Sequence, residues 1–458
     1  MKAEELRQQG RVAAALAAAR GPIGALPAEL LVVRARALWD MEHTEAAAEQ
    51  AFEAVRRDPT LPAARAMRGL AQLDAGDLGA AWDEAEYAQK RAPEEPLTYL
   101  LLSELHGEHG QFEEAAALLS EGVRRRPFDA DLRLHRAGWL SQIERGEESL
   151  RDVEVVLTRF PEHVLALSVR AALLGASDRA DRALDSAGEA VRLAPKCAGA
   201  LMALGLVHFW RAEDDVARRV LGRAVRTAPA SPRIATVRAL PELRSDPRAA
   251  LALLPDGKLC CRPSVHADIR YLQAVCHHCL DAPEESRRLL DSALEYQPWH
   301  LESLDLRCWL LLLADEEEGA LRDAQAVLAR HPDELRARSV RGAVQVRHER
   351  WNAALEDSSV ALATDPQDVL SLWVHGTACA MTGDTERARA ALSRLTAVDA
   401  TGELTSRLAA LVATARPEAD RTDWSKRTWE VLHRVGTVVS LAGVLAGVGG
   451  SVGGGSSA

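Results

Sequence analysis

Residues 62–95, PAARAMRGLAQLDAGDLGAAWDEAEYAQKRAPEE, decide the fold. Their first half is rich in Ala and Leu and predicts one helix, which Gly76 and Asp77 then interrupt with a turn. A second helix is expected to reach about Arg91. It must end there, because Pro93 has no amide hydrogen and clashes with the preceding helical turn. The stretch therefore predicts a single helix-turn-helix element.

The same element recurs along most of the chain. Prolines follow one another at a constant spacing, at Pro59, Pro93, Pro127, Pro161, Pro195, Pro229 and Pro263, and the series resumes at Pro298, Pro332 and Pro366 after one extra residue. Small side chains recur at fixed distances from these prolines, because a large side chain there would push packed helices apart. One such set lies twelve positions before the prolines, at Ala47, Ala81, Ala115, Ser149, Ala183, Ala217, Ser286, Ala320, Ala354 and Ala388, and a second, partial set is Gly69, Gly205, Gly342 and Gly376.

A repeat of about 34 residues with small side chains at these points, and a proline after its second helix, resembles the tetratricopeptide repeat family. The resemblance covers about residues 28–402 and implies an all-α, right-handed superhelical solenoid of helix-turn-helix repeats. Eleven repeats are expected to start near residues 28, 62, 96, 130, 164, 198, 232, 267, 301, 335 and 369.

The segments outside the repeats differ in character. Residues 1–27 are expected to form a capping half-repeat at the front, and residues 403–416 a capping helix behind the last repeat. A polar joint with a short amphipathic helix follows at 417–434, and an apolar, Gly-rich tail at 435–458.

The seventh repeat, near 232–266, departs from the pattern. Pro241, Pro247 and Pro255 interrupt what should be a full second helix. We expect a kink or a protruding loop between 241 and 265. The alternative is a repeat that has simply decayed.

Composition excludes several functions. The formal net charge of −11 argues against nonspecific nucleic-acid binding, which needs many Lys and Arg side chains to neutralise phosphates. No nucleophile motif and no phosphate-binding loop is present, so neither catalysis nor a cofactor is expected. Residues 1–5, MKAEE, carry acids where a secretion signal has an apolar core, and a cytoplasmic location is expected.

The resemblance implies a concave groove lined by the first helix of each repeat, at its second, fifth, ninth, twelfth and thirteenth positions. Large apolar side chains at these positions favour recognition of an amphipathic helix or an apolar segment of a protein partner. The alternative is that they fill the core between repeats. They include Leu97, Leu100, Met202, Leu206, Phe209, Trp210, Tyr271, Trp309, Leu312, Trp373 and Met381.

Some members of this family hold a partner's C-terminal carboxylate with a clamp of Lys, Asn and Arg side chains. The matching positions of the first three repeats do not carry that combination, so this mode of binding is not expected. They hold Glu29, Val32, Arg36, Ala63, Ala66, Leu70, Leu97, Leu100 and Glu104.

Soft metal ligands gather in one place only, at Cys260, Cys261, Cys276 and Cys279. Zinc needs four such ligands in a tetrahedron, and a Cys-x-x-Cys pair supplies half a site. The other half is poor, because adjacent cysteines rarely bind one ion together. We expect these residues to be packing residues and no metal to be bound; a metal site and a redox role are the alternatives.

The C-terminal tail is the least repeat-like part of the chain. Residues 435–452, VGTVVSLAGVLAGVGGSV, carry no charge and would form a helix about 27 Å long, close to the thickness of a bilayer core. Three roles are open: membrane contact, docking on this or another copy of the chain, and disorder. The residues concerned are Trp424 and Trp429 as interfacial anchors, Leu441 and Leu445 as apolar contacts, and Gly443 and Gly447 as a glycine zipper for self-association.

Together these features predict a non-enzymatic scaffold that binds a protein partner in its groove and tethers itself through its tail to a membrane or to further copies. An alternative is a sensor-effector protein, in which partner binding to the repeats releases a membrane-perturbing tail.

Overall fold

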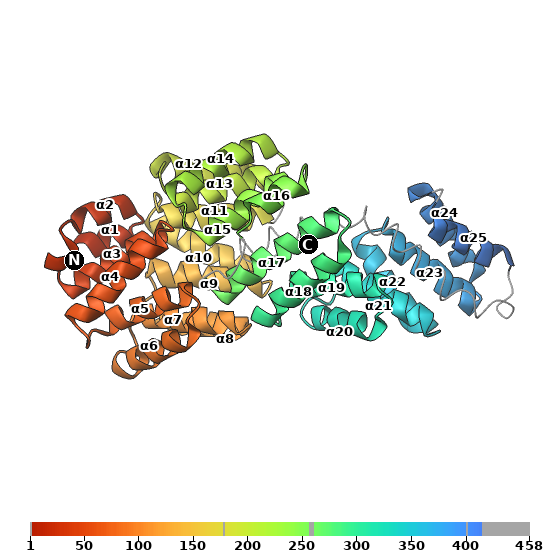
Figure 1. Ribbon diagram of the computed structural model, residues 1–458, viewed down its shortest axis with the longest axis horizontal. Helices are drawn as coiled ribbons and strands as arrows, with labels where there is room; N and C mark the ends of the chain where they lie inside the picture. The colour runs from red at the N-terminus through yellow and green to blue at the C-terminus, as the bar shows by residue number, and fades with distance from the viewer. Residues whose placement is uncertain (1, 177–178, 256–260, 400–401, 415–458) are drawn as a thin grey trace. The chain divides into compact units, whose positions relative to one another are not determined.

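The computed structural model describes residues 2–176, 179–255, 261–399 and 402–414 (Figure 1). These residues form 25 α-helices and one short 3-10 helix, η1 (Ile23–Ala25), and contain no strand. The predicted all-α class is confirmed. The N-terminal segment holds two short helices, α1 (Lys2–Gln8) and α2 (Val12–Ala18), which pair ahead of the repeats.

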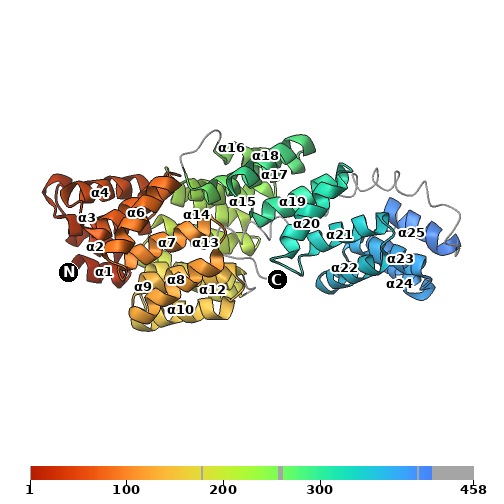
Figure 2. The same ribbon diagram turned by 90° about the horizontal axis from the view of Figure 1, so that it is seen from below.

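Eleven helix pairs follow within the described residues (Figures 1 and 2). The first helices are α3 (Ala28–Asp40), α5 (Pro62–Asp74), α7 (Pro96–Glu108), α9 (Ala130–Gln142), α11 (Val164–Ala176), α13 (Ala198–Trp210), α15 (Pro232–Leu243), α17 (Pro263–Cys279), α19 (Leu301–Leu313), α21 (Leu335–Arg347) and α23 (Val369–Thr382). The second helices are α4 (Thr44–Arg57), α6 (Leu78–Arg91), α8 (Phe112–Arg125), α10 (Gly146–Arg159), α12 (Ala180–Leu193), α14 (Asp214–Thr227), α16 (Pro247–Leu253), α18 (Pro283–Tyr296), α20 (Glu317–Leu328), α22 (Trp351–Thr364) and α24 (Thr385–Val398). Helix α25 (Glu403–Thr414) packs behind the last pair.

Contacts divide the chain into two compact bodies. The N-terminal body includes Met1–Cys276, and the C-terminal body begins at His277. The division falls inside the last turn of α17, which begins at Pro263, ahead of the start expected near 267. Pro263 therefore opens a helix where the sequence pattern used it to close one, because proline fits the first turn of a helix, where the amide hydrogen is not needed.

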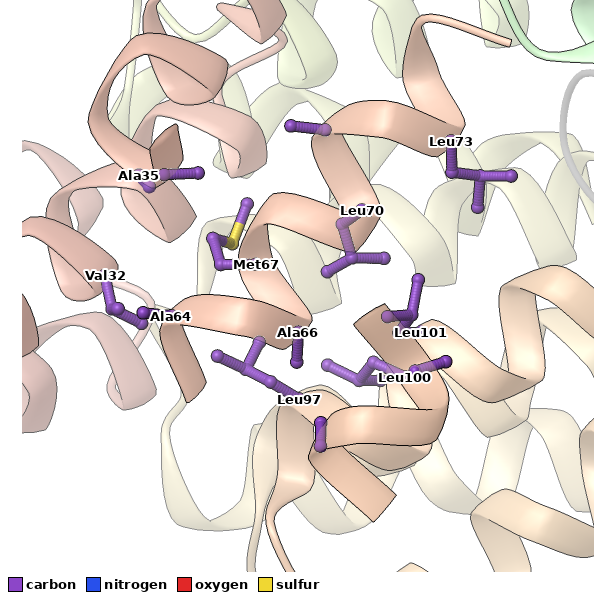
Figure 3. Packing of buried hydrophobic residues seen from close by; sticks show 14 of the residues in the cluster. Val32, Ala35, Ala64, Ala66, Met67, Leu70, Leu73, Leu97, Leu100 and Leu101 are labelled. Atoms are coloured by element: carbon purple, nitrogen blue, oxygen red, sulfur yellow. The ribbon is translucent and has the colours of Figure 1, made fainter. Parts of the chain in front are cut away.

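Each first helix packs between its neighbours in the stack. Figure 3 shows Met67 and Leu70 of α5 between side chains of α3 and side chains of α7. All of these side chains are buried, and they belong to one continuous hydrophobic cluster that spans three successive repeats. The labelled set is Val32, Ala35, Ala64, Ala66, Met67, Leu70, Leu73, Leu97, Leu100 and Leu101.

The small-residue positions are places of close approach, as predicted. A Cβ atom added at Gly69 would lie 2.4 Å from a methyl carbon of Leu101 in the next repeat. At Gly376 it would lie 2.5 Å from a methyl carbon of Leu408, and at Gly205 2.5 Å from Leu221. Atoms do not approach this closely, so the leucine side chain would have to move or the helices would have to separate.

Ion pairs join the two helices of a repeat. In the fourth repeat, Arg136 Nε lies 2.6 Å from Asp152 Oδ2, and Arg133 Nη1 lies 2.6 Å from Oδ1 of the same carboxylate. Arg133 also donates to the carbonyl of Pro127, at 2.7 Å. The same arrangement recurs in the repeats that begin at 62 and 335, as Arg65 and Arg68 with Glu84 and as Arg338 and Arg341 with Asp357.

The seventh repeat has a short second helix. Helix α16 spans seven residues, against twelve to fourteen in the other second helices. Its first turn is fixed by Asp246, whose side chain accepts hydrogen bonds from the amides of Arg248 and Ala249. The helix ends at Leu253 because Pro255 follows shortly. Residues 256–260 lie outside the described part.

Gly107→Ala is expected to destabilise the N-terminal body, because the added Cβ would lie 2.0–2.7 Å from three atoms of the rigid Trp139 ring and would displace that ring as a whole. We expect a loss of about 1–3 kcal/mol in the free energy of unfolding, measured by thermal or urea unfolding. Gly138→Ala is the matched control. Nothing lies within 4 Å of its added Cβ, so this variant should be unchanged or more stable. Equal stability of the two variants would contradict the packing described here.

Candidate binding surfaces

Charged side chains from several repeats meet inside the N-terminal body. They come from the first helices α3, α5, α7 and α9, together with α1 and the start of α17. We call this group the inner polar cluster. Its members are Arg7, Arg36, Asp40, Asp74, Glu104, Glu108, Asp131, His135 and Arg262.

Helix α1 contributes Arg7, whose side chain is buried. Its guanidinium donates two hydrogen bonds to Asp131 of α9, Nη2 to Oδ2 at 2.6 Å and Nη1 to Oδ1 at 3.0 Å. It also lies 3.5 Å from Asp40 of α3. Arg36, only 1% exposed, lies between the same two carboxylates, 3.4 Å from Asp40 and 3.7 Å from Asp131. The N-terminal helix thereby connects the first and fourth repeats.

Arg262, the residue just before α17, also belongs to the cluster. Its Nε donates to Asp74 Oδ1 at 2.6 Å, and its Nη1 donates to Glu104. Glu104 also lies 3.1 Å from the Nδ1 atom of His135. Two positions further on, Ser264 donates to Glu108 from its hydroxyl, at 2.6 Å, and from its backbone amide, at 3.0 Å. These contacts join the start of α17 to the second and third repeats.

An aromatic side chain lies among these charges. The Trp39 indole N–H donates to Asp74 at 2.6 Å, and the ring stacks on His135 with centroids 5.7 Å apart and planes 9° from parallel. Arg36 lies over the same indole, 4.7 Å from its centroid. Cation–π contact of this kind gains strength when water is excluded.

The pKa shifts in the cluster follow from burial and from the ion pairs. Burial alone would raise the pKa of Glu104, but Arg262 and His135 hold it well below its usual value. Burial would likewise raise the pKa of Asp131, but Arg7 and Arg36 hold that pKa well below its usual value. Burial dominates at Asp40 and Glu108, whose pKa values are raised. The cluster has five carboxyl groups and three guanidinium groups, so not every carboxylate can have a full counter-charge.

Further contacts close the N-terminal body upon itself. Glu42 of the first repeat accepts hydrogen bonds from Ser231, at 3.1 Å, and Arg233, at 3.0 Å, both in the seventh repeat. A Cβ atom added at Gly10 would lie 2.5 Å from His163 at the start of α11. The chain's own segments, α1 and residues 261–264, thus occupy the inner face of this body, where the resemblance placed a partner.

The predicted groove residues are mostly buried. Leu97 and Leu100 belong to the core between α5 and α7 (Figure 3). The Phe209 ring lies under Arg244, 4.0 Å from its guanidinium carbon, and Trp210 covers Gly175. Trp210 is half-buried. Binding at these residues stays a prediction; the buried members are Leu97, Leu100, Met202, Leu206, Phe209, Tyr271, Trp309 and Trp373.

The C-terminal body has a different inner face. The positions that carry charges in α3, α5 and α7 are mostly apolar in α19, α21 and α23. Trp309 and Trp373 are 7% and 4% exposed, and neither indole N–H has a hydrogen-bond acceptor among the described residues. We call this surface the apolar inner face and define it by Trp309, Leu312, Ala343, Val346, Trp373 and Met381.

The sequence reasoning placed Arg36 and Glu104 at groove positions but missed the polar cluster to which they belong. A signal for it was present. Asp40, Asp74 and Glu108 are acids that all lie at the thirteenth position of a repeat, in three successive repeats. Such a column of acids in successive first helices requires partners across the array. An Arg followed sixteen positions later by an acid, as in Arg136 and Asp152, was instead a signal for the ion pairs between the two helices of one repeat.

The cysteine candidates do not assemble into a site in the described residues. Cys261 and Cys276 are buried and Cys279 is partly buried, whereas Cys260 lies outside the description. Within the described ranges, no group of three or more His, Cys, Asp or Glu side chains could hold a metal ion.

The tail predictions cannot be placed on the structure. Trp424, Trp429, Leu441, Gly443, Leu445 and Gly447 all lie outside the described residues. Among the helices that are described, none combines the length and the apolar character needed to cross a bilayer.

Arg262→Ala is expected to destabilise the N-terminal body by about 3–5 kcal/mol at pH 7.5, because it leaves Glu104 and Glu108 buried without their cation. Without that cation, burial raises both carboxyl pKa values, so the variant should bind protons on folding and gain stability as the pH falls from 7.5 to 5. The wild-type Glu104, with its lowered pKa, keeps its contribution over that range and loses it only below its ordinary pKa.

Melting temperatures followed by circular dichroism at pH 7.5 and pH 5 measure this difference. Arg56→Ala removes an exposed pair with Glu53 and should change stability little at either pH. A variant at Arg262 that melts like the wild type, or that loses further stability at pH 5, would show that the cluster is not held as described.

Comparison with known proteins agrees with the repeat. Residues 32–96 match the sequence model of a family described as tetratricopeptide repeat. No curated protein matches the chain. The crystal structure of the APC/C hetero-tetramer Cut9-Hcn1 is similar, with a TM-score of 0.61 at 15% identity over 90% of this chain and 82% of that chain.

A tetratricopeptide repeat protein from Parabacteroides merdae also matches, at 18% identity over 51% of this chain and 92% of that chain, with a TM-score of 0.37. At 15% identity, the Cut9-Hcn1 structure shows the fold alone. The constant period of the prolines, the stacked helix pairs and the match of residues 32–96 identify the chain as a tetratricopeptide repeat protein.

Proposed function

We propose that this chain is a non-enzymatic interaction scaffold whose C-terminal body binds an apolar segment or amphipathic helix of a protein partner. The observation that carries the proposal is the contrast between the two inner faces. The N-terminal body fills its inner face with its own charged side chains, whereas Trp309, Ala343 and Met381 of the C-terminal body stand at repeat positions that carry charge in the N-terminal body. Large aromatic side chains supply much of the contact energy in protein recognition.

The match to the tetratricopeptide repeat model supports a role in protein binding, because these repeats generally mediate protein–protein interaction. The similar solved structure is itself an assembly of two proteins, Cut9 and Hcn1. What that assembly binds is a property of those proteins. For this chain it supports only the general expectation of a polypeptide partner.

The energetics favour the C-terminal body as the binding surface. A partner that entered the N-terminal body would have to displace Arg7 or Arg262 and leave buried carboxylates unpaired. Breaking such a pair costs about 3–5 kcal/mol. The six side chains of the apolar inner face form no ion pair that a partner would have to break, and the indole N–H groups of Trp309 and Trp373 would gain acceptors.

The tail completes the proposal. Its uncharged run, residues 435–452, is proposed to contact a membrane or further copies of the chain and so to tether the bound partner in the cytoplasm. A second candidate function is the sensor-effector, in which the repeats hold this run until a partner releases it. The apolar character of the inner face favours that candidate, because such a surface can hold an apolar segment.

A fluorescein-labelled amphipathic 18-residue helix with one leucine face should bind the full-length protein, whereas a scrambled peptide of the same composition should bind at least tenfold more weakly. Trp309→Ala and Trp373→Ala should each weaken binding about tenfold or more, as aromatic anchors do. Fluorescence anisotropy titrations measure both effects.

Phe128→Ala is the control, because this ring is 62% exposed on the N-terminal body and should not affect the peptide. Circular dichroism of each variant separates lost binding from lost folding. Equal affinity for the scrambled peptide, or unchanged affinity of both Trp variants when folded, would reject this surface.

A further inference from the structure

We propose that Asp40 and Asp131 form a binding site for an arginine side chain on a short helix of a partner protein. In the chain by itself, helix α1 occupies this site through Arg7. The partner replaces α1 and supplies a guanidinium group of its own. The site lies in the N-terminal body, so the proposal goes beyond the proposed function and does not rest on binding at the C-terminal body.

The site holds one guanidinium group between two repeats. Asp40 is the last residue of α3, and Asp131 lies in the first turn of α9. Arg7 donates to both oxygens of Asp131, at 2.6 and 3.0 Å, and to Asp40 Oδ2 at 3.5 Å. With α1 in place, the two carboxylate side chains are only 6% and 5% exposed. Parallel bonds to one carboxylate match the planar fork of arginine, and lysine cannot reproduce them.

Helix α1 leaves part of the site's hydrogen-bonding capacity unused. Asp40 Oδ1 accepts no hydrogen bond from the described residues, although Arg36 Nε lies 3.4 Å away. His163 is 3% exposed and packs against Gly10, directly after α1. Its Nδ1 accepts from the amide of Ala166, and burial lowers the pKa of His163 to about 4, so the neutral ring carries its proton on Nε2. That N–H has no acceptor among the described residues.

Few side chains hold α1 in the site. Its seven residues bury only Ala3 and Arg7. Gln8 adds two hydrogen bonds, one to Asp131 at 3.1 Å and one from the backbone amide that begins α9, at 3.2 Å. Glu4 accepts from the Arg7 guanidinium at 2.7 and 3.1 Å and so orients it. The recognised pattern is therefore a glutamate, an arginine three positions later and a glutamine directly after it, on one short helix.

A partner with this pattern avoids the cost that excludes other partners from the N-terminal body. Without Arg7, the carboxyl groups of Asp40, Asp129 and Asp131 would face Arg36. An incoming guanidinium restores each bond that Arg7 gives up. The tethered α1 competes at an effective concentration on the order of 1 mM, so the partner must gain contacts that α1 lacks. Asp40 Oδ1 and the imidazole next to Gly10 offer an acceptor and a donor for such contacts.

Fluorescence anisotropy with a labelled peptide of residues 2–11, KAEELRQQGR, tests the proposal. The receptor is the full-length variant Arg7→Ala, whose own α1 no longer brings a guanidinium group. This variant should bind the peptide about tenfold or more tightly than the wild type does, because the tethered α1 keeps the wild-type site occupied.

Two altered peptides of equal net charge separate recognition by the site from general attraction to negative charge. Arg11 is exposed in the chain, so the peptide with Arg11→Ala should bind like the original. The peptide with Arg7→Ala should bind about tenfold or more weakly, because it loses the paired bonds. Equal affinity of the two altered peptides would overturn the proposal, and so would equal affinity of the original peptide for wild type and variant.

A second receptor covers the case in which Arg7→Ala does not fold. Arg7→Lys keeps the charge but loses the parallel bonds, so it should also bind the peptide more tightly than the wild type. Circular dichroism shows whether each variant is folded. If neither variant folds, or if the folded variants bind no peptide, α1 is a fixed part of the structure and the proposal is wrong.

The location of the peptide is checked separately from the proposed function. Adding Trp309→Ala to Arg7→Ala should leave the affinity for the peptide unchanged, because Trp309 belongs to the C-terminal body. Lost binding in the folded double variant would place the peptide on the C-terminal body and overturn the assignment to Asp40 and Asp131.

Discussion

The close approach of each helix pair to the next, at positions where only Gly, Ala or Ser fits, is the constraint on which this structure depends. An isolated helical hairpin cannot bury its apolar face, so it is stable only when a neighbour covers it. Gly69, Gly107 and Gly376 lie where a Cβ atom would collide with a side chain of the next repeat or its cap. The repeat period, broken only by one extra residue after Pro263, follows from this requirement.

Stacking leaves an inner face in each body, and the two bodies use it in opposite ways. In the N-terminal body, carboxylates from successive first helices converge, and the chain supplies Arg7 and Arg262 to neutralise them. Those arginines come from the first helix and the eighth repeat, so the ion pairs connect segments distant in the sequence. In the C-terminal body, Trp309 and Trp373 occupy the equivalent face and form no such connection through their indole groups among the described residues. The N-terminal face therefore contributes to stability, and binding at the C-terminal face is our proposal.

The repeat and the all-α class could be predicted because both depend on local, periodic signals: prolines, small residues and turns such as Gly76-Asp77. The start of α17 at Pro263 could not, because the shortened α16 changes whether a proline closes one helix or opens the next. The inner polar cluster could not be assembled either. It joins Arg7 to Asp131 and Arg262 to Asp74, residues that only the curvature of the stack brings together.

Hydroxyl-radical footprinting of the full chain tests most directly the claim that the chain's own arginines close the inner face of the N-terminal body. The account predicts that Trp39, which donates to Asp74 beside Arg262, becomes more reactive in Arg262→Ala than in the wild type, whereas the buried Trp309 and Trp373 are equally protected in both proteins. Equal reactivity of Trp39 in the wild type and in Arg262→Ala would contradict it.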